Sequence, residues 1–231
     1  MAALLQGEPV PNVRSRRRKR RTPFERQVAD DVQTDWPRNG LAQPNQDDPM
    51  DHDEYGPLPR GVNHIGLTVD DLDQASAFLA KGLGAQWCYD GLTTEDAPRQ
   101  GPEVERQLGL SKGDRIVRQR LMRIGNGPNV EIFEIETAVA SPPLRLQDRG
   151  WNHISVYCDD IEGALRRLIA AGATALSAVH GNSRHEDTPG NGSVYVRPPW
   201  GGLIELQSIP GGYYYPDDSE APTWTPEARQ D

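Results

Sequence analysis

Cysteine and long apolar runs are scarce in this chain of 231 residues. Its two cysteines, Cys88 and Cys158, form no Cys-X-X-Cys pair and no framework spacing, which favours a reducing, intracellular setting over a disulfide scaffold. No apolar run approaches the roughly 18 residues of a membrane span, and the first residues lack the apolar core of a secretory signal. We therefore expect a cytoplasmic protein that has no membrane partner.

Positive charge and apolar residues are also in short supply. The net charge is -9, so the folded part is not expected to bind nucleic acid. Hydrophobic residues make up 35% of the chain, a low fraction for a fully globular protein, which predicts that part of the chain is disordered. No glycine-rich loop of the phosphate-cradling type is present, so no organic cofactor is expected.

Both ends of the chain have the composition of polar tails. Residues 1–58 contain the run RSRRRKRR and then an acidic, proline-rich stretch, and residues 211–231 are again rich in proline and polar residues. The basic run has two interpretations: a nuclear-localisation or anionic-surface signal, or a solvated and disordered arm, which is favoured. The folded domain is expected between the tails, at residues 59–210.

The domain repeats itself. The stretch VNHIGLTVDD begins at Val62, and WNHISVYCDD begins at Trp151, 89 positions later. Asn-His-Ile and Asp-Asp occupy the same places in both stretches. Two copies with so long a period indicate a duplicated module rather than a solenoid.

Each copy predicts the element order β-α-β-β-β, and so an α+β fold. The first strand (62–69; 151–158) leads to the Asp-Asp pair, which suits a helix start because its carboxylates accept backbone N–H bonds. Helices are expected at 71–84 and 160–173, each ending near glycine. Further strands are expected at 85–90, 115–125 and 129–136 in the first copy and at 174–179, 192–199 and 202–209 in the second.

The first and last strands of each copy carry side chains that suit a metal ion. Because strand side chains alternate between two faces, His64 and His153 are expected opposite the apolar face that meets the helix. The last strands carry Glu131 and Glu205 among apolar residues, where a carboxylate is costly unless it is paired or binds a metal. Two imidazoles and two carboxylates suit a divalent ion of the Zn, Ni, Co, Mn or Fe type.

The chain resembles the vicinal oxygen chelate superfamily: glyoxalase I, methylmalonyl-CoA epimerase, bleomycin- and fosfomycin-resistance proteins, and extradiol dioxygenases. The motifs NHIGLTVDDLD, GNGPNVEIFE, WNHISVYCDDIE and PPWGGLIELQS carry the resemblance, in this order. It implies a glyoxalase-like domain in which two βαβββ modules, 60–137 and 150–210, form a cupped mixed β-sheet with helices outside. It also implies a homodimer, and a metal in the cup held by His64, Glu131, His153 and Glu205.

The resemblance leaves three classes of function open. The first is a metal-dependent lyase or isomerase that moves a proton next to a carbonyl of a small oxygenated substrate, through a metal-stabilised enediolate or enolate. Glu205 is the first candidate for its base and Glu131 the second. The second class is an Fe(II) extradiol-type dioxygenase, which needs only His64, His153 and Glu205. The third is a non-catalytic, resistance-type binding protein. Glu131, as a fourth ligand, favours the first class.

Other polar residues near the expected cup have two interpretations each. His185 lies in a loop and is interpreted as a solvated histidine in preference to a general acid or base. Arg118 and Arg120 share a strand face, where they hold an anionic group of the substrate or decorate a solvent-exposed face, which is favoured. Glu134 is expected as an outer or edge charge. The segment 91–113 is expected to contain a short helix and to form a wall or lid of the cup.

Overall fold

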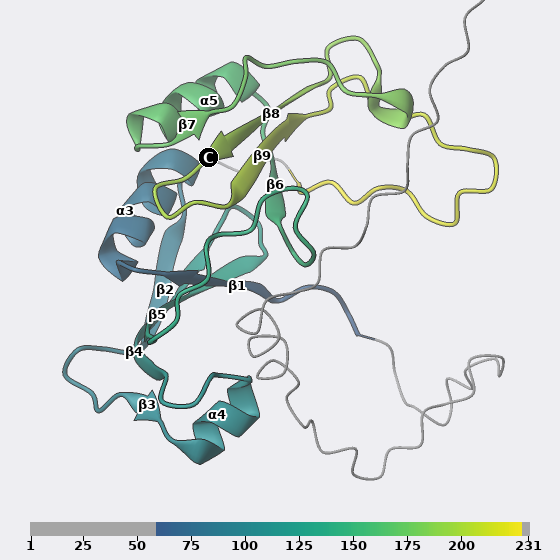
Figure 1. The fold of residues 1–231 in the computed structure, drawn as a ribbon. Helices are drawn as coiled ribbons and strands as arrows, with labels where there is room; N and C mark the ends of the chain where they lie inside the picture. The colour runs from purple at the N-terminus through teal and green to yellow at the C-terminus, as the bar shows by residue number, and fades with distance from the viewer. Residues whose placement is uncertain (1–58, 228–231) are drawn as a thin grey trace, which may run out of the picture. The chain divides into compact units, whose positions relative to one another are not determined.

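A computed structural model describes residues 59–227 of the chain (Figure 1). The predicted tail at 1–58, with its basic run, lies outside the described residues, and so do residues 228–231. The domain boundaries drawn from composition therefore stay predictions.

The first module begins at β1 and ends at β5. Its elements are β1 (His64–Val69), α3 (Leu72–Leu83), β2 (Gln86–Leu92), β3 (Arg99–Gln100), α4 (Pro102–Leu108), β4 (Arg115–Arg123) and β5 (Asn129–Glu136). The strands form a sheet in the order β1-β5-β4-β2, and β3 pairs with β4. β1 is parallel to β5, whereas β4 is antiparallel to β5 and β2. The short helix expected in the segment 91–113 is α4, which lies with β3 at one end of the molecule (Figure 1).

The second module repeats this plan. Its elements are β6 (His153–Tyr157), α5 (Ile161–Ala170), β7 (Thr174–Ala175), the 3-10 helix η1 (Arg184–Glu186), β8 (Gly192–Arg197) and β9 (Leu203–Ser208). The strand order is β6-β9-β8-β7, and β6 is again parallel to the last strand. The predicted α+β class and βαβββ order are therefore confirmed. Within residues 59–227 the strands form two sheets, one in each module, and no strand of one module is hydrogen-bonded to a strand of the other.

The duplicated Asp-Asp pairs start the two helices as predicted. The Asp71 side chain accepts a hydrogen bond from the backbone N–H of Gln74, and Asp160 accepts one from Gly163. Each bond satisfies a helix N–H that has no partner within the helix. α3 ends at Gly84, whose φ of 64° lies in the left-handed region. The end of α5 is also near a glycine, as predicted: Gly172 follows the cap residue Ala171 with a φ of 112°, and its N–H donates to the backbone oxygen of Ile169.

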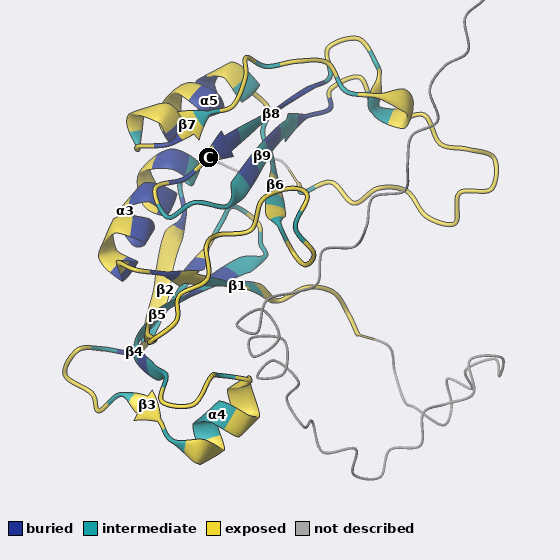
Figure 2. Ribbon diagram, viewed as in Figure 1, coloured by how far each residue is buried: buried dark blue, intermediate teal, exposed yellow. Residues whose placement is uncertain are grey.

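One apolar core joins the modules. The amphipathic helices α3 and α5 turn their buried sides toward each other and toward the sheets (Figure 2). Leu168 of α5, Ile132 of β5 and Leu206 of β9 are fully buried in this core. The helices approach closely at Gly82, where an added Cβ would lie 2.7 Å from the Leu168 side chain. Hydrophobic burial of about 25 cal/mol per Å² thus favours a fixed arrangement of the two modules.

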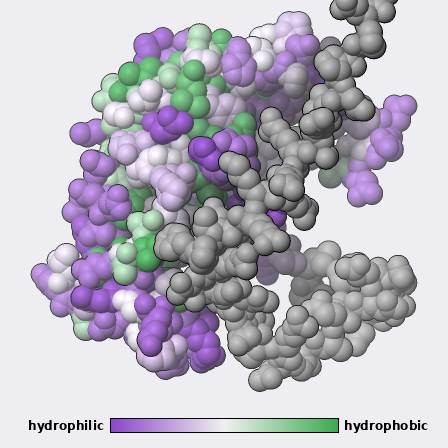
Figure 3. Space-filling view, viewed as in Figure 1, coloured by the Kyte–Doolittle hydropathy of each residue, from purple (hydrophilic) through white to green (hydrophobic). Residues whose placement is uncertain are grey.

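Hydrophilic side chains cover the outer side of this core. They gather over the exposed side of α3 and around α4 in the face that Figure 3 displays. None of the helices within residues 59–227 is both long and apolar enough to span a bilayer.

Candidate functional site

His64 and His153 take matching places at the starts of β1 and β6. Along β1, His64 is exposed, whereas Leu67 and Val69, on the opposite face of the strand, pack in the core. Along β6, His153 is exposed and Ile154 packs against the core. The predicted orientation of both histidines, away from the helix side of each sheet, is confirmed.

Parallel strand pairing brings one glutamate beside each histidine. Glu131 and Glu205 each lie opposite the residue two places after the histidine of their own module. The Nε2 atom of His64 is 3.4 Å from the Glu131 carboxylate, and that of His153 is 3.8 Å from the Glu205 carboxylate. Each module therefore presents one His–Glu pair on the face of its sheet that is turned away from the core.

The separation within each pair fits two ligands of one divalent ion. Nitrogen and oxygen ligands at about 2.0–2.2 Å from an ion, at octahedral to tetrahedral angles, lie roughly 2.8–3.6 Å apart. The pair His64–Glu131 meets this range, and the pair His153–Glu205 exceeds it by a few tenths of an ångström, which a side-chain rotation supplies. Both separations exceed the roughly 2.7–3.2 Å of an N–H···O hydrogen bond. The donor set is thus suited to a cation between its members.

The two pairs do not meet within one chain. Across residues 59–227, no three His, Cys, Asp or Glu side chains lie close enough together to hold a metal. A single chain thus offers two half-sites. The ligand set His64, Glu131, His153 and Glu205 stays a prediction, and it needs an assembly that unites the half-sites.

Glu131 is held in place by a chain of polar contacts from its own module. Gln119 of β4 donates a hydrogen bond from Nε2 to one carboxylate oxygen of Glu131, while the other oxygen faces His64. Arg99 of β3 in turn donates to the Gln119 side-chain oxygen at 3.3 Å. Because that oxygen accepts from Arg99, the amide nitrogen is turned toward Glu131. Sequence analysis missed Gln119, whose only sequence signal is its place on a strand beside β5.

Glu205 has a different neighbour, Tyr195 of β8. Tyr195 lies directly opposite Glu205 in the strand register. Its ring also meets the His153 ring edge-on, with 5.5 Å between the centroids. Burial raises the pKa of Tyr195, and the Glu205 carboxylate raises it further. The phenol therefore keeps its proton and can donate a hydrogen bond to Glu205, a role that was not predicted from the sequence.

A third carboxylate approaches the second module's open face from η1. Glu186 accepts a hydrogen bond from the Gln207 side chain at 3.2 Å, two residues along β9 from Glu205. It also contributes, after burial, to the raised pKa of Tyr213. The neighbouring His185 is exposed, in keeping with its interpretation as a solvated histidine.

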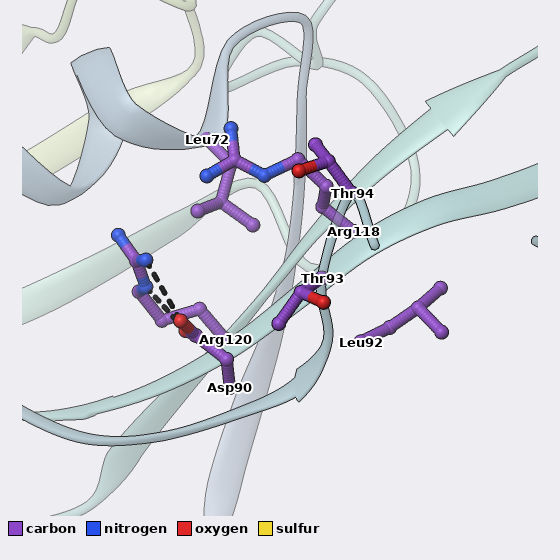
Figure 4. A pocket seen from close by; sticks show the side chains of 7 residues that line it. All are labelled: Leu72, Asp90, Leu92, Thr93, Thr94, Arg118 and Arg120. Carbon is purple, nitrogen blue, oxygen red and sulfur yellow. Dashed lines mark hydrogen bonds and ion pairs between the residues drawn. The ribbon is translucent and has the colours of Figure 1, made fainter. Parts of the chain in front are cut away.

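Arg118 and Arg120 take neither of their predicted roles. They point to the helix side of β4, and each side chain is only 18% exposed, so the favoured solvent-face interpretation was wrong. Arg118 forms two bonds with Asp73, at 2.8 and 2.9 Å. Arg120 forms two bonds with Asp90, at 2.6 and 3.0 Å, which are drawn in Figure 4. These hydrogen bonds lower the pKa of both aspartates. With their charges balanced internally, the arginines act as structural ion pairs.

Glu134 shares this partly buried network, so its predicted place as an outer charge was also wrong. Its carboxylate accepts a hydrogen bond from the backbone N–H of Leu72, at the first residue of α3, and lies 3.5 Å from Arg118. It therefore joins β5 to the start of the helix.

The fold and these motifs place the chain in a family. It belongs to the Glyoxalase/Bleomycin resistance protein/Dioxygenase superfamily, whose family model matches residues 63–188. The vicinal oxygen chelate resemblance is thereby confirmed. The glyoxalase-like fold is confirmed as well by the crystal structure of a glyoxalase family protein from Bacillus cereus. That structure has a TM-score of 0.52 and 21% identity, and the match covers 66% of this chain and 95% of that one.

Two further relatives are proteins of known kind. A 2-epi-5-epi-valiolone epimerase from an Actinomyces species is 29% identical over 171 residues, which cover 72% of this chain and 88% of the epimerase. A mutant fosfomycin resistance protein from Listeria monocytogenes, in a structure complexed with Mn(II), is 21% identical. Its TM-score is 0.42, and the match covers 65% of this chain and 90% of that one.

Proposed function

We propose that this chain is a divalent-metal-dependent epimerase that inverts a stereocentre next to the carbonyl of a small hydroxylated ketone. The observation that carries the proposal is the pair of matched half-sites, His64 with Glu131 and His153 with Glu205, each on the open face of its sheet. The relative named as a 2-epi-5-epi-valiolone epimerase supports epimerisation as the reaction and its own substrate as the first compound to test.

A second copy of the chain completes the site in this proposal. The His64–Glu131 half-site of one copy faces the His153–Glu205 half-site of the other, and a two-fold axis generates two such sites. The open surface beside the half-sites supports the arrangement. Trp151 and Val62, which stand two residues before the two histidines, are 98% and 71% exposed. Large apolar side chains at a matched, exposed place favour an interface.

The four side chains would hold the ion through two imidazole nitrogens and two carboxylates. A bound divalent ion would supply Lewis-acid polarisation of the substrate carbonyl. The hydrogen bond from Gln119 to Glu131 would hold that carboxylate in position for an ion.

Glu205 is the proposed base and Glu131 the proposed acid. Glu205 removes the proton from the carbon next to the carbonyl, and the electron pair of that C–H bond moves onto the carbonyl oxygen. The protonated Glu131 carboxyl returns a proton to the opposite side of the carbon, with the electron pair moving back, which completes the inversion. Glu205 then loses its proton to solvent and Glu131 regains one, which balances the atoms. Tyr195, whose pKa is raised, can donate a hydrogen bond to Glu205 and hold its carboxylate toward the substrate.

Proton exchange with solvent tests this function. The full-length protein, loaded in turn with Mn²⁺, Co²⁺, Ni²⁺ and Zn²⁺, is incubated in D₂O with 2-epi-5-epi-valiolone and related cyclic hydroxyketones. We expect deuterium to replace the hydrogen next to the carbonyl as the epimer forms, and proton NMR measures both changes. No oxygen should be consumed. Metal-loaded protein that neither exchanges the proton nor forms an epimer would contradict the proposal. Oxygen uptake with a catechol would support the dioxygenase instead.

A further inference from the structure

The residue before each histidine contacts the imidazole on its other side. Asn63 Oδ1 lies 2.9 Å from Nδ1 of His64, and Asn152 Oδ1 lies 2.7 Å from Nδ1 of His153. Both distances are those of a hydrogen bond, whereas the distances from Nε2 to the glutamates are longer. Each ring is therefore oriented from its Nδ1 side.

The amide of Asn152 has only one orientation that satisfies its contacts. Its Nδ2 donates a hydrogen bond to the backbone oxygen of Leu146, in the segment between the two modules, at 3.0 Å. With the nitrogen used in this way, the atom that faces His153 is the amide oxygen, which can only accept. The Nδ1 atom of His153 must then carry the hydrogen, and in a neutral imidazole Nε2 is left with the lone pair.

We infer that Asn63 and Asn152 are positioning residues that hold His64 and His153 as the Nδ1–H tautomer, with the Nε2 lone pair directed toward the glutamate of the same half-site. This inference rests on the proposed function for its purpose, because a metal binds the nitrogen that lacks a hydrogen. A lone pair that faces a carboxylate is repelled by it until a cation lies between the two. The repeated Asn-His motif thus prepares each half-site for a cation.

If Asn63 and Asn152 only stabilised the fold, replacing them would leave the histidine tautomers unchanged. A structural role and a positioning role can therefore be distinguished. Asn63 also has a structural contact, because its backbone oxygen accepts hydrogen bonds from the backbone and the side chain of Asn129. Asn129 lies opposite His64 in the strand register but bonds to the Asn63 backbone. The substitution Asn129→Ala is therefore the matched control: it disturbs the same strand end and leaves the imidazole contact in place.

The test reads the tautomer directly in the metal-free, full-length protein. Imidazole ¹⁵N NMR spectra are recorded at about pH 9, above the ordinary histidine range, so that neutral rings are observed. We expect the Nδ1–H form for His64 and His153 in the wild type and in Asn129→Ala. The substitutions Asn63→Leu and Asn152→Leu should shift the adjacent histidine toward the Nε2–H form, which free imidazole side chains favour in water. Asn152→Asp, which keeps an acceptor oxygen, should retain Nδ1–H.

Metal affinity supplies the second readout. The Leu variants should bind Co²⁺ about 10- to 100-fold more weakly than the wild type, the usual effect of removing the outer partner of a metal-binding histidine. The inference is overturned if the wild type has the Nε2–H form. It is also overturned if a Leu variant keeps both the Nδ1–H form and the wild-type Co²⁺ affinity. The wild-type spectrum decides even if a variant does not fold. If the wild type has the Nδ1–H form and the tautomers shift as stated while no protein binds Co²⁺, the tautomer assignment is supported and the metal-dependent function fails.

Discussion

The two modules present the same His–Glu pair in different surroundings. In the first module, Gln119 bonds to one oxygen of Glu131 and the other faces His64, so both carboxylate oxygens are engaged. In the second module, Tyr195 lies beside Glu205 as a phenol with a raised pKa. In the proposed site, the first module would therefore fix the position of Glu131 as a ligand, whereas the second module places a hydrogen-bond donor beside Glu205.

The core faces of the modules differ as well. Counting from the matched glutamates, the place that Arg120 takes beside Ile132 is taken by Val194 beside Leu206 in the second module. Arg120 belongs to a network of ion pairs, whereas Val194 is fully buried among apolar side chains. At this matched position, the first module therefore uses an ion pair where the second module uses apolar burial.

The largest expected effect is on metal binding and activity, when the histidine of one half-site is replaced. His64→Ala and His153→Ala should each remove most of the bound metal and the activity, because each breaks one His–Glu pair. An equimolar, re-equilibrated mixture of the two inactive variants should recover about a quarter of the wild-type activity, because half of the dimers are mixed and one of their two sites is intact. Metal content by mass spectrometry and the epimerisation rate measure both effects. His185→Ala is the control and should behave as wild type, and a mixture as inactive as its components would contradict a site shared between copies.

The next effect compares the two carboxylates. Glu205→Gln should lower the rate of proton exchange by about 10²–10⁴-fold, the usual contribution of one acid or base, because Gln keeps an oxygen donor but loses basicity. Glu131→Gln should lose no more than Glu205→Gln. Solvent deuterium incorporation measures both rates. If Glu131→Gln leaves metal and turnover unchanged while Glu205→Gln releases iron, the three-ligand dioxygenase is the better description.

A smaller effect concerns the core faces. Asp90→Asn should lower the free energy of unfolding at neutral pH by about 1–3 kcal/mol, because Arg120 loses its charged partner. The pKa of Asp90 is lowered in the folded state, so the unfolded state binds more protons between the two pKa values and the stabilisation falls as the pH drops below about 4. The stability difference between Asp90→Asn and wild type should therefore shrink in acid.

Val194→Ala is the matched substitution in the second module. It should also cost on the order of 1–3 kcal/mol, through lost apolar burial and a cavity, and this cost should not change with pH. Urea unfolding at several pH values compares the two. An Asp90→Asn effect that is independent of pH would contradict the assignment of that stabilisation to the ion pair.

The smallest effect distinguishes the two thiols. Cys88 of β2 is exposed, whereas burial raises the pKa of Cys158, after β6, to about 11. Because the thiolate is the reactive form, iodoacetamide at neutral pH should label Cys88 and leave Cys158 unmodified in the folded protein. Peptide mass spectrometry locates the label, and rapid labelling of Cys158 would indicate that the second module opens readily.

Much of the local structure could be predicted because it depends on neighbours in sequence. Period-two alternation assigned His64 and His153 to the face away from the helices, and the Asp-Asp motif marked where both helices begin. The same reasoning failed for Arg118 and Glu134. Alternation predicts which face of a strand a side chain lies on. It does not predict whether a charged residue of another element lies on the same face and pairs with that side chain.

Hydrophobic periodicity and helix capping act over a few residues, so the duplicated βαβββ order and the helix starts could be predicted from the amino-acid sequence. The same patterns singled out one histidine and one glutamate in each module. Three outcomes could be seen only in the folded chain: which side chains surround each glutamate, that the arginines are largely covered and paired with aspartates, and that the two His–Glu pairs lie apart within residues 59–227. These outcomes depend on strand register and on how α3 packs against α5, since both join residues that are distant in sequence.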